Sequence, residues 1–421
     1  MKAETPEQQA FRLHCREWLK NNIPAAPTMR LPQSAIGLME RDQLEYLQRW
    51  QKAAYEAGLV GCDYPKPYGG GRTNCQRIAN EEMQKVKLPY FPNVIGLGMA
   101  APTLFYHASE ELKQKLLPKL FSADEIWCQG FSEPGAGSDL ASVQTFAQFR
   151  KGEEGRGDKW IINGHKVWTS LAHFASWMIL LARTDKNPSD KLSIDKYGGM
   201  TFFVVPIKSA LGNGVTVRPL IKATGETGFN EVLFENLEID DSYRLDEVGK
   251  GWQVAMTTLT HERGAGQLVM PSSGGQTDSD FSSIAGVRDV IELSKRSYRP
   301  DGTLASQDPL IRDQLMNLLI RDEGMMQSMR LHFVEGLREH PMRIPMQGKL
   351  VVSELIQDVA ELALEVQGME STLYVADAQA PDKGRWAQAY INSFANTIAA
   401  GSSEVQRNIL GERVLNLPKS K

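Results

Sequence analysis

Glycines and hydroxyl side chains that could hold a ligand gather in one segment of the chain, residues 127–139. Gly135 and Gly137 permit a tight turn that brings backbone N–H groups close to a ligand, and Ser132 and Ser138 add hydroxyls. The segment lacks the third glycine and the βαβ setting of a dinucleotide fingerprint. It also lacks the Gly-x-Ser-x-Gly spacing of a nucleophile elbow. Taken alone, the segment is about as compatible with a turn of no function as with a binding loop.

The residue types that bind metals or form disulfides show no pattern typical of either. None of the four cysteines lies in a Cys-x-x-Cys arrangement, and the seven histidines show no ligand spacing of three or four residues. We therefore predict no metal site and no disulfide framework. Such cysteine usage is typical of a reducing compartment, and we expect a cytoplasmic protein.

The composition is that of a globular protein with no bulk affinity for nucleic acid. Of its 421 residues, 42% are hydrophobic and 23% are charged, which argues against extended disorder and predicts two or three domains. The net charge is −4, whereas a binder of the phosphate backbone needs a basic surface. The N-terminus does not resemble a signal peptide, and no stretch is long and apolar enough to span a membrane.

Residues 127–139 lie where the sequence pattern changes from one typical of helices to one typical of strands. Residues 1–126 are predicted to form an N-terminal helical domain, which begins with Thr5 as helix cap and Pro6 in the first turn. Residues 127–243 contain short apolar or β-branched runs separated by Gly, Asn and Pro, and they predict an antiparallel β-barrel or sandwich. Within this β domain, Asn163–Gly164 between two such runs predicts a two-residue hairpin turn.

Residues 244–421 are predicted to form a C-terminal helical bundle, which makes the fold class α+β. The expected long helices cover residues 309–339, 349–366, 385–398 and 403–415, and residues 271–283 are expected to form a loop. A cleft where such domains meet is a common place for a cofactor.

Three blocks in register make the chain resemble the acyl-CoA dehydrogenase family. They are Ser-Glu-Pro-Gly-Ala-Gly-Ser-Asp at 132–139, Asn-Gly-His-Lys-Val-Trp-Thr-Ser at 163–170, and Gly-Ser-Ser-Glu-Val-Gln-Arg-Asn-Ile-Leu-Gly-Glu-Arg-Val-Leu at 401–415. The resemblance covers nearly the whole chain. It implies an FAD-dependent enzyme of lipid or acid catabolism that converts an acyl-CoA thioester to a trans-2-enoyl-CoA. It also implies an electron-transfer flavoprotein as acceptor, and a homo- or hetero-tetramer or a dimer.

The resemblance further implies where the cofactor and the substrate bind. Matching positions that line the flavin are Gln129, Phe131 and Ser132 on one side and Trp168, Thr169 and Ser170 on the other, with Ser402 and Glu404 near the FAD. Ser138 and Arg263 match positions near the acyl-CoA. Donors at the pyrimidine edge of a flavin stabilise charge on the reduced ring. The alternative is that Trp168 packs in the core of the β domain and that Thr169 and Ser170 are ordinary strand hydroxyls.

The position of the catalytic base departs from the commonest family pattern. Many members carry a Glu where this chain has Ala400, which cannot accept a proton. Some branches, the isovaleryl-CoA type among them, place the Glu in a Glu-Arg pair on the first helix of the bundle, which here is Glu262–Arg263. We therefore expect Glu262 to take the α-proton, and the Ala400 backbone N–H to bind the thioester oxygen. The alternative is that Glu262 only pairs with Arg263 or a neighbouring helix.

A second departure concerns the arginine that reaches the FAD of a neighbouring subunit in the family pattern Arg-x-x-Phe-Gly. Here the matching stretch is residues 296–302, in which the Phe is missing and Tyr298 falls where the Arg is expected. Arg296 or Arg299 is a possible substitute. The two departures leave two other functions open. One is a flavin oxidase or monooxygenase of the same fold, and the other is a non-catalytic partner subunit of a mixed tetramer.

Overall fold

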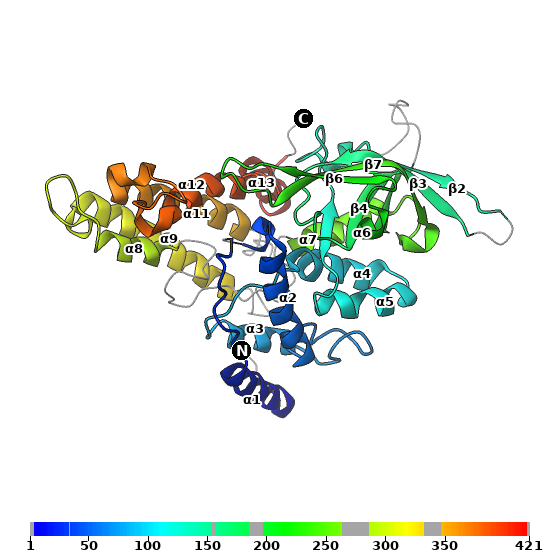
Figure 1. The fold of residues 1–421 in the computed structure, drawn as a ribbon, viewed down its shortest axis with the longest axis horizontal. Coiled ribbons are helices and arrows are strands. Elements are labelled where there is room, and N and C mark those ends of the chain that lie inside the picture. The colour runs from blue at the N-terminus through cyan, green and yellow to red at the C-terminus, as the bar shows by residue number, and fades with distance from the viewer. Residues whose placement is uncertain are drawn as a thin grey trace. The chain divides into compact units, whose positions relative to one another are not determined.

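The computed structural model describes residues 4–32, 34–153, 157–184, 197–262, 286–331 and 347–418 (Figure 1). The chain divides into two compact units, the larger within residues 4–283 and the smaller within residues 284–421. Helices come first, then a β-sheet, then a second set of helices, which confirms the predicted α+β class.

Helices form the N-terminal part of the larger unit. They are α1 (Pro6–Asn21), α2 (Arg41–Glu56), α3 (Cys75–Met83), α4 (Ala101–His107) and α5 (Glu110–Phe121). Thr5 caps α1 as expected, and its side chain and that of Gln8 form a reciprocal capping box. Ser109 caps α5 by accepting a hydrogen bond from the N–H of Leu112 at 3.3 Å.

Helices α1 and α3 are joined by a group of charged side chains rather than by apolar contact alone. Glu82 on α3 is only 2% exposed and receives hydrogen bonds from Arg12 and Arg16 on α1 and from Lys85. Burial alone would raise the pKa of Glu82, but these three cations hold it at about 2. The carboxylate is therefore charged at neutral pH and ties the first helix to the rest of the unit.

Within the described residues, the β-sheet has eight strands in the order β6-β7-β3-β2-β4-β5-β8, with β1 added beside β4. The strands are β1 (Trp127–Gly130), β2 (Phe146–Arg150), β3 (Lys159–Lys166), β4 (Trp177–Arg183), β5 (Met200–Val205), β6 (Val215–Leu220), β7 (Phe229–Asp240) and β8 (Arg244–Leu245). Most neighbouring pairs are antiparallel, but β1 and β2 each pair with β4 in parallel. One face packs its own core, which includes Trp160, Phe203 and Phe234.

The predicted hairpin at Asn163–Gly164 is wrong. Strand β3 runs through these two residues, and the register against β7 shifts between Ile162 and Gly164, which marks a β-bulge. A Cβ atom on Gly164 would lie 2.4 Å from Thr145 Oγ1, so the glycine permits a close approach. Asn163 Oδ1 accepts a hydrogen bond from the N–H of Asn236 on β7 at 2.8 Å. Residues typical of a tight turn therefore serve a bulge instead.

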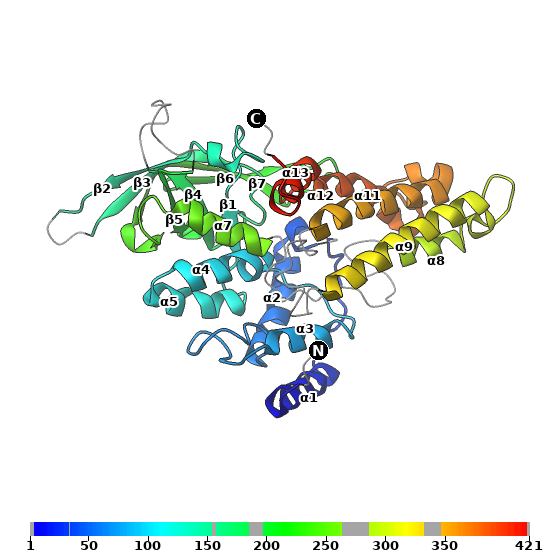
Figure 2. The ribbon, with the colours of Figure 1, turned by 180° about the vertical axis from the view of Figure 1, so that it is seen from behind.

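Helix α7 (Gly251–Glu262) packs against β4, β5 and α4 within the larger unit (Figure 2). A Cβ atom on Gly251 would lie 2.7 Å from the backbone of Thr201, so only glycine lets the start of α7 rest on β5. At the far side, the hydroxyls of Thr103 on α4 and Thr258 on α7 lie 2.8 Å apart. The last residue of this helix, Glu262, is therefore carried by an element fixed to the sheet and to α4.

The smaller unit is helical, as predicted. Among the described residues, its helices of eight or more residues are α8 (Val287–Ser294), α9 (Pro309–Leu331), α11 (Gly348–Gln367), α12 (Arg385–Asn396) and α13 (Ser403–Arg413). Ile311 and Leu315 on α9 pack with Val359 and Ala363 on α11 and with Trp386 on α12 in one core. The expected extension of the long helix to residue 339 and the expected loop at 271–283 lie outside the described residues. No helix in the described ranges is long and apolar enough to cross a membrane.

Candidate functional site

The first predicted flavin-lining segment leaves the sheet at the end of β1. Gln129 is a half-buried residue of that strand, and Ser132 is half-buried in the following loop. Phe131 is nearly buried and its ring meets Phe202 of β5 edge-on, with 5.7 Å between centroids. The strand and this aromatic contact hold the segment against the sheet.

The second predicted segment follows β3 and is bonded to the first. The N–H of Val167 donates to the carbonyl of Ser132 at 2.9 Å, and Lys166 Nζ donates to the carbonyl of Phe131 at 3.0 Å. The structure therefore places Phe131–Ser132 beside Lys166–Val167, which directly precede Trp168–Ser170, although about 35 residues separate the two segments along the chain.

Trp168 is not a core residue of the β domain. Its side chain is 60% exposed, its φ is +57°, and its ring meets Phe229 edge-on at 5.9 Å. This finding excludes the alternative in which Trp168 only packs inside the sheet. A large aromatic ring held at the surface by strained backbone is a feature of binding sites more than of stability.

Thr169 is wholly buried, and its hydroxyl Oγ1 has no hydrogen-bond partner among the described residues. The backbone of Thr169 is fully used, because it exchanges two hydrogen bonds with Asn230 at 3.0 and 3.1 Å. Asn230 Oδ1 is a second buried atom that lacks a partner within the described part of the chain. Buried polar atoms are normally satisfied, so a hydroxyl without a partner beside an exposed indole is compatible with a ligand-binding site.

These features fit a flavin ring. Trp168 offers a flat apolar face, Thr169 offers a hydroxyl, and the half-buried Ser170 and Gln129 offer further donors and acceptors. A flavin needs stacking on its apolar faces and hydrogen bonds at its pyrimidine edge.

The glycine-rich turn after Ser132 leaves open space around its backbone. Glu133 and Ala136 exchange two backbone hydrogen bonds, at 2.8 and 3.1 Å, and close the turn. Cβ atoms added to Gly135 or Gly137 would meet no atom within 4 Å, and neither glycine has a positive φ. The chain itself therefore does not require glycine here, and the space beside the exposed Ser138 is open to a ligand.

Glu262, the expected base, is the last residue of α7 and is half-exposed. Its helix is held by His107, whose ring nitrogens contact Asp246 at 3.1 Å and Thr257 at 2.8 Å. The neighbouring His261 lies near the ring of Tyr106, with 6.2 Å between centroids. Arg263, the expected substrate contact, lies outside the described residues.

In the smaller unit, Ala400, Ser402 and Glu404 lie at the start of α13. Ala400 has a φ of +55°, and its carbonyl accepts a hydrogen bond from Gln406 Nε2 at 2.9 Å. Ser402 caps α13 by accepting from the N–H of Val405 at 3.3 Å. The backbone N–H of Glu404 itself and the hydroxyl of Ser402 lower the pKa of the exposed Glu404. Two hydrogen bonds, from Gln406 to the Ala400 carbonyl and from Val405 to Ser402, therefore hold the turn at Ala400.

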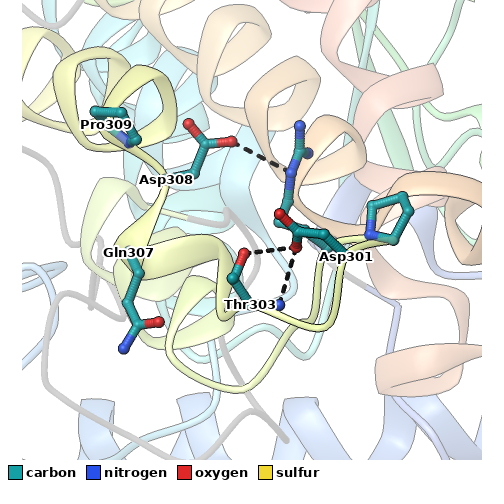
Figure 3. Close-up of a pocket in the computed structure, with 7 residues that line it drawn as sticks. Asp301, Thr303, Gln307, Asp308 and Pro309 are labelled. Atoms are coloured by element: carbon teal, nitrogen blue, oxygen red, sulfur yellow. Dashed lines mark hydrogen bonds and ion pairs between the residues drawn. The ribbon is translucent and has the colours of Figure 1, made fainter.

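The two arginines that could replace the family arginine have different partners in the smaller unit. Arg296 forms a bidentate pair with Asp382, with both distances 2.7 Å. Arg299 Nε lies 3.3 Å from Asp308, and both residues line a depression of about 500 Å³, in which Figure 3 labels Asp308. Thr303 in the same depression donates to Asp301 from its N–H and its hydroxyl. Arg299 therefore has the weaker ion pair of the two arginines and is the better candidate for a contact with FAD.

A second depression, of about 240 Å³, lies at the start of α7. Its lining includes Lys250 and the rings of Tyr197 and Trp252, whose centroids are 4.7 Å apart. Sequence reasoning did not point to this place, and neither depression contains a predicted flavin-lining residue. Sequence reasoning also missed Lys166, Glu133 and Asn230, although the first two lie inside the motif blocks.

Comparison with known proteins identifies the family. The acyl-CoA dehydrogenase N-terminal domain matches residues 5–124, the middle domain residues 128–240 and the C-terminal domain residues 249–415. The chain belongs to the acyl-CoA dehydrogenase family. Its activity is that of an acyl-CoA dehydrogenase, an oxidoreductase of the FAD-dependent class.

The chain is similar to acyl-CoA dehydrogenase IpdE1 of Mycolicibacterium smegmatis (strain ATCC 700084 / mc(2)155), at 34% identity over 419 residues and 98% of each chain. Among solved structures it is similar to the Tcur3481–Tcur3483 steroid acyl-CoA dehydrogenase, with a TM-score of 0.74, 25% identity and 99% of each chain covered. It is also similar to a chain of the ChsE4–ChsE5 complex of Mycobacterium tuberculosis, with a TM-score of 0.71, 23% identity and full coverage of both chains.

Proposed function

We propose that this chain binds FAD and catalyses the α,β-dehydrogenation of an acyl-CoA thioester to a trans-2-enoyl-CoA. The observation that carries the proposal is the hydrogen bonding of Phe131 and Ser132 to Lys166 and Val167, which directly precede Trp168–Ser170, together with the buried Thr169 hydroxyl, which has no partner among the described residues. When bound, FAD would supply the acceptor for the hydride that leaves the β-carbon. The two boundaries between the three predicted domains, at 126/127 and 243/244, remain a prediction.

Glu262 takes the proton from the α-carbon. The carboxylate is the group that the reaction needs, and Ala400 cannot supply it. Helix α7 is anchored through Gly251, His107 and Thr258, so it presents Glu262 from a rigid support. The proton moves to a Glu262 oxygen as the hydride leaves the β-carbon, which leaves a double bond between the two carbons.

The thioester oxygen accumulates negative charge during this step and needs a hydrogen-bond donor. The backbone N–H of Ala400 takes this role, which does not depend on its side chain. Ser402, the cap of α13, and Glu404 contribute to the FAD site. The defined turn at Ala400, with its carbonyl bonded to Gln406, supports a fixed position for the N–H.

The acyl-CoA substrate is held by Ser138 and Arg263, and its CoA part extends to the depression at the start of α7. Trp252 and Glu262 are ten residues apart on this helix, which corresponds to about 15 Å at the α-helical rise. An extended pantetheine arm spans a distance of this order. The ring pair of Tyr197 and Trp252 and the cation of Lys250 suit the far end of such a ligand.

The proposed partners are an electron-transfer flavoprotein as acceptor and a second acyl-CoA dehydrogenase chain in a mixed oligomer. The ChsE4–ChsE5 complex and the Tcur3481–Tcur3483 protein are each named for two different chains. A homotetramer or homodimer is the alternative assembly. The steroid substrate named for the Tcur3481–Tcur3483 protein makes ring-containing acyl groups the first class to test here.

The test is an anaerobic titration of the purified chain, alone and with its candidate partner, followed by flavin absorbance. The panel contains straight short, straight long, branched and ring-containing acyl-CoA thioesters. Bleaching of the flavin by one class supports the proposal and names the substrate type. An FAD-loaded protein that no thioester bleaches would favour a flavin oxidase or monooxygenase. If the chain binds no FAD, either alone or with its partner, it is a non-catalytic subunit.

A further inference from the structure

We propose that the buried ion pair of Lys166 and Glu133 is a positioning device that holds the two flavin-facing segments at one fixed spacing. Lys166 is the last residue of β3, and Glu133 follows the β1 exit loop. Their side chains are 0% and 6% exposed, and Lys166 Nζ lies 2.8 Å from Glu133 Oε1. This inference rests on the proposed function, because it assigns these residues a role toward FAD.

The pair is bonded to the backbone on both sides of the site. Lys166 Nζ donates a second hydrogen bond to the carbonyl of Phe131 at 3.0 Å. The next residue after Lys166, Val167, donates its N–H to the carbonyl of Ser132 at 2.9 Å. The two consecutive carbonyls that precede Glu133 are thus both held by the end of β3.

Glu133 extends the connection to a third segment. Its two carboxylate oxygens accept the N–H groups of Gln144 at 2.6 Å and Thr145 at 2.9 Å, just before β2. One ion pair therefore joins the exit of β1, the end of β3 and the approach to β2. Since Trp168, Thr169 and Ser170 come directly after Val167, their position relative to Phe131 and Ser132 depends on this junction.

The electrostatics of the pair favour a geometric role over a stabilising one. Burial lowers the pKa of Lys166 to about 8, and against the effect of burial the Lys166 charge holds the pKa of Glu133 below its ordinary value. A buried ion pair is often no more stabilising than apolar residues of the same shape, because desolvation offsets the attraction. Its directional hydrogen bonds, however, define a spacing that apolar packing does not.

Three variants separate positioning from stability. Glu133→Gln and Lys166→Met each leave one buried partner unpaired, whereas the double variant Glu133→Gln/Lys166→Met removes both charges and keeps most of the volume. We expect the single variants to lower the melting temperature and the double variant to recover much of it. In all three, we expect the dissociation constant for FAD to rise about tenfold or more, because small displacements of a contact surface have effects of this order.

The measurements use the chain together with its partner where the partner is needed for folding. FAD binding is followed by quenching of flavin fluorescence, and the midpoint potential of the bound flavin is measured at saturating FAD. The matched control is Glu82→Gln, which removes another buried carboxylate of the same unit away from the site. We expect this control to lower the melting temperature and leave FAD affinity and potential unchanged.

The result that overturns the inference is a double variant with wild-type FAD affinity and midpoint potential. The inference is also overturned if Glu82→Gln weakens FAD binding as much as Glu133→Gln does, because the loss of FAD affinity would then result from lower stability alone. If the wild-type protein binds no FAD at all, the proposed function fails and this inference fails with it. The two failures are distinguishable because the wild-type protein is measured first.

Discussion

The hydroxyls of Thr103 on α4 and Thr258 on α7 lie 2.8 Å apart, and both side chains are wholly buried. Thr103 also donates to the carbonyl of Met99 at 2.7 Å. Thr258 Oγ1 in turn lies 3.2 Å from the carbonyl of Val254, and either hydroxyl can be the donor between the two threonines. This bond lies one helical turn before Glu262, and it fixes the helix that carries the proposed base.

We predict that Thr103→Val and Thr258→Val each lower the free energy of unfolding by about 1 kcal/mol, the net value of one hydrogen bond. In a double-mutant cycle measured by denaturant unfolding, the double variant should cost clearly less than the sum. Turnover should fall in both single variants while the dissociation constant for FAD stays unchanged. Additive costs would show that the two hydroxyls do not interact, and unchanged turnover would show that the bond does not position Glu262.

Replacement of the proposed base should separate cofactor binding from chemistry. Glu262→Gln keeps the size of the side chain and removes its ability to accept a proton, so we expect normal FAD content and a loss of anaerobic flavin reduction of about 10²- to 10⁴-fold. Stopped-flow absorbance with the best thioester of the panel measures this rate. The control is Glu292→Gln, an exposed helical carboxylate on α8, which should reduce the flavin at the wild-type rate. Wild-type reduction in Glu262→Gln would place the base elsewhere.

Local signals in the sequence were sufficient for most helices but not for the bulge in β3. The cap at Thr5 and its partner Gln8 are three residues apart, so the start of α1 can be predicted from a short window. The conformation of Asn163–Gly164 depends on two distant residues. Asn236 lies 73 residues after Asn163, and Thr145 lies 19 residues before Gly164. The same dipeptide suits a hairpin turn or a bulge, and long-range strand pairing decides between them.

The residues that hold the candidate site together were harder to predict than the residues that line it. The resemblance of the sequence to a family pointed to Phe131, Ser132 and Thr169. Nothing in the sequence indicated that Lys166 is buried, because a strand lysine is ordinarily exposed and its partner Glu133 lies 33 residues earlier. Burial of a charge becomes visible only when both partners are placed in space.

Insertion of a carboxylate at position 400 should not improve the enzyme. In Ala400→Glu, a second carboxylate near the thioester would raise the pKa of both groups and compete for the same proton. We expect turnover at or below the wild-type rate, measured with a dye acceptor at neutral pH. The combination with Glu262→Gln is the control, since it leaves one carboxylate at the family's commoner position. Faster turnover in Ala400→Glu alone would show that Glu262 is not the working base.

The arginines of the smaller unit should differ in their effects on FAD. We expect Arg299→Ala to raise the dissociation constant for FAD about tenfold, because charged hydrogen bonds to a pyrophosphate contribute about 1.5–3 kcal/mol. Arg296→Ala should instead lower the melting temperature, since it breaks the bidentate pair with Asp382. Fluorescence titration with FAD and thermal unfolding of both variants measure the two effects. The opposite assignment of effects would mean that Arg296 is the FAD contact.

Acid should weaken the attachment of α1 through Glu82. Its pKa in the folded protein is about 2, below the ordinary value of 4.5, so its contribution to stability is present above pH 4.5 and is lost as the pH falls from 4.5 toward 2. Glu82→Gln should cost about 2 kcal/mol at pH 7, less than a fully enclosed pair because Arg16 and Lys85 are about half exposed. Unfolding free energies of the wild type and Glu82→Gln, measured from pH 7 to pH 3, should converge as the pH falls. A difference that stays constant with pH would show that the Glu82 charge does not carry this stability.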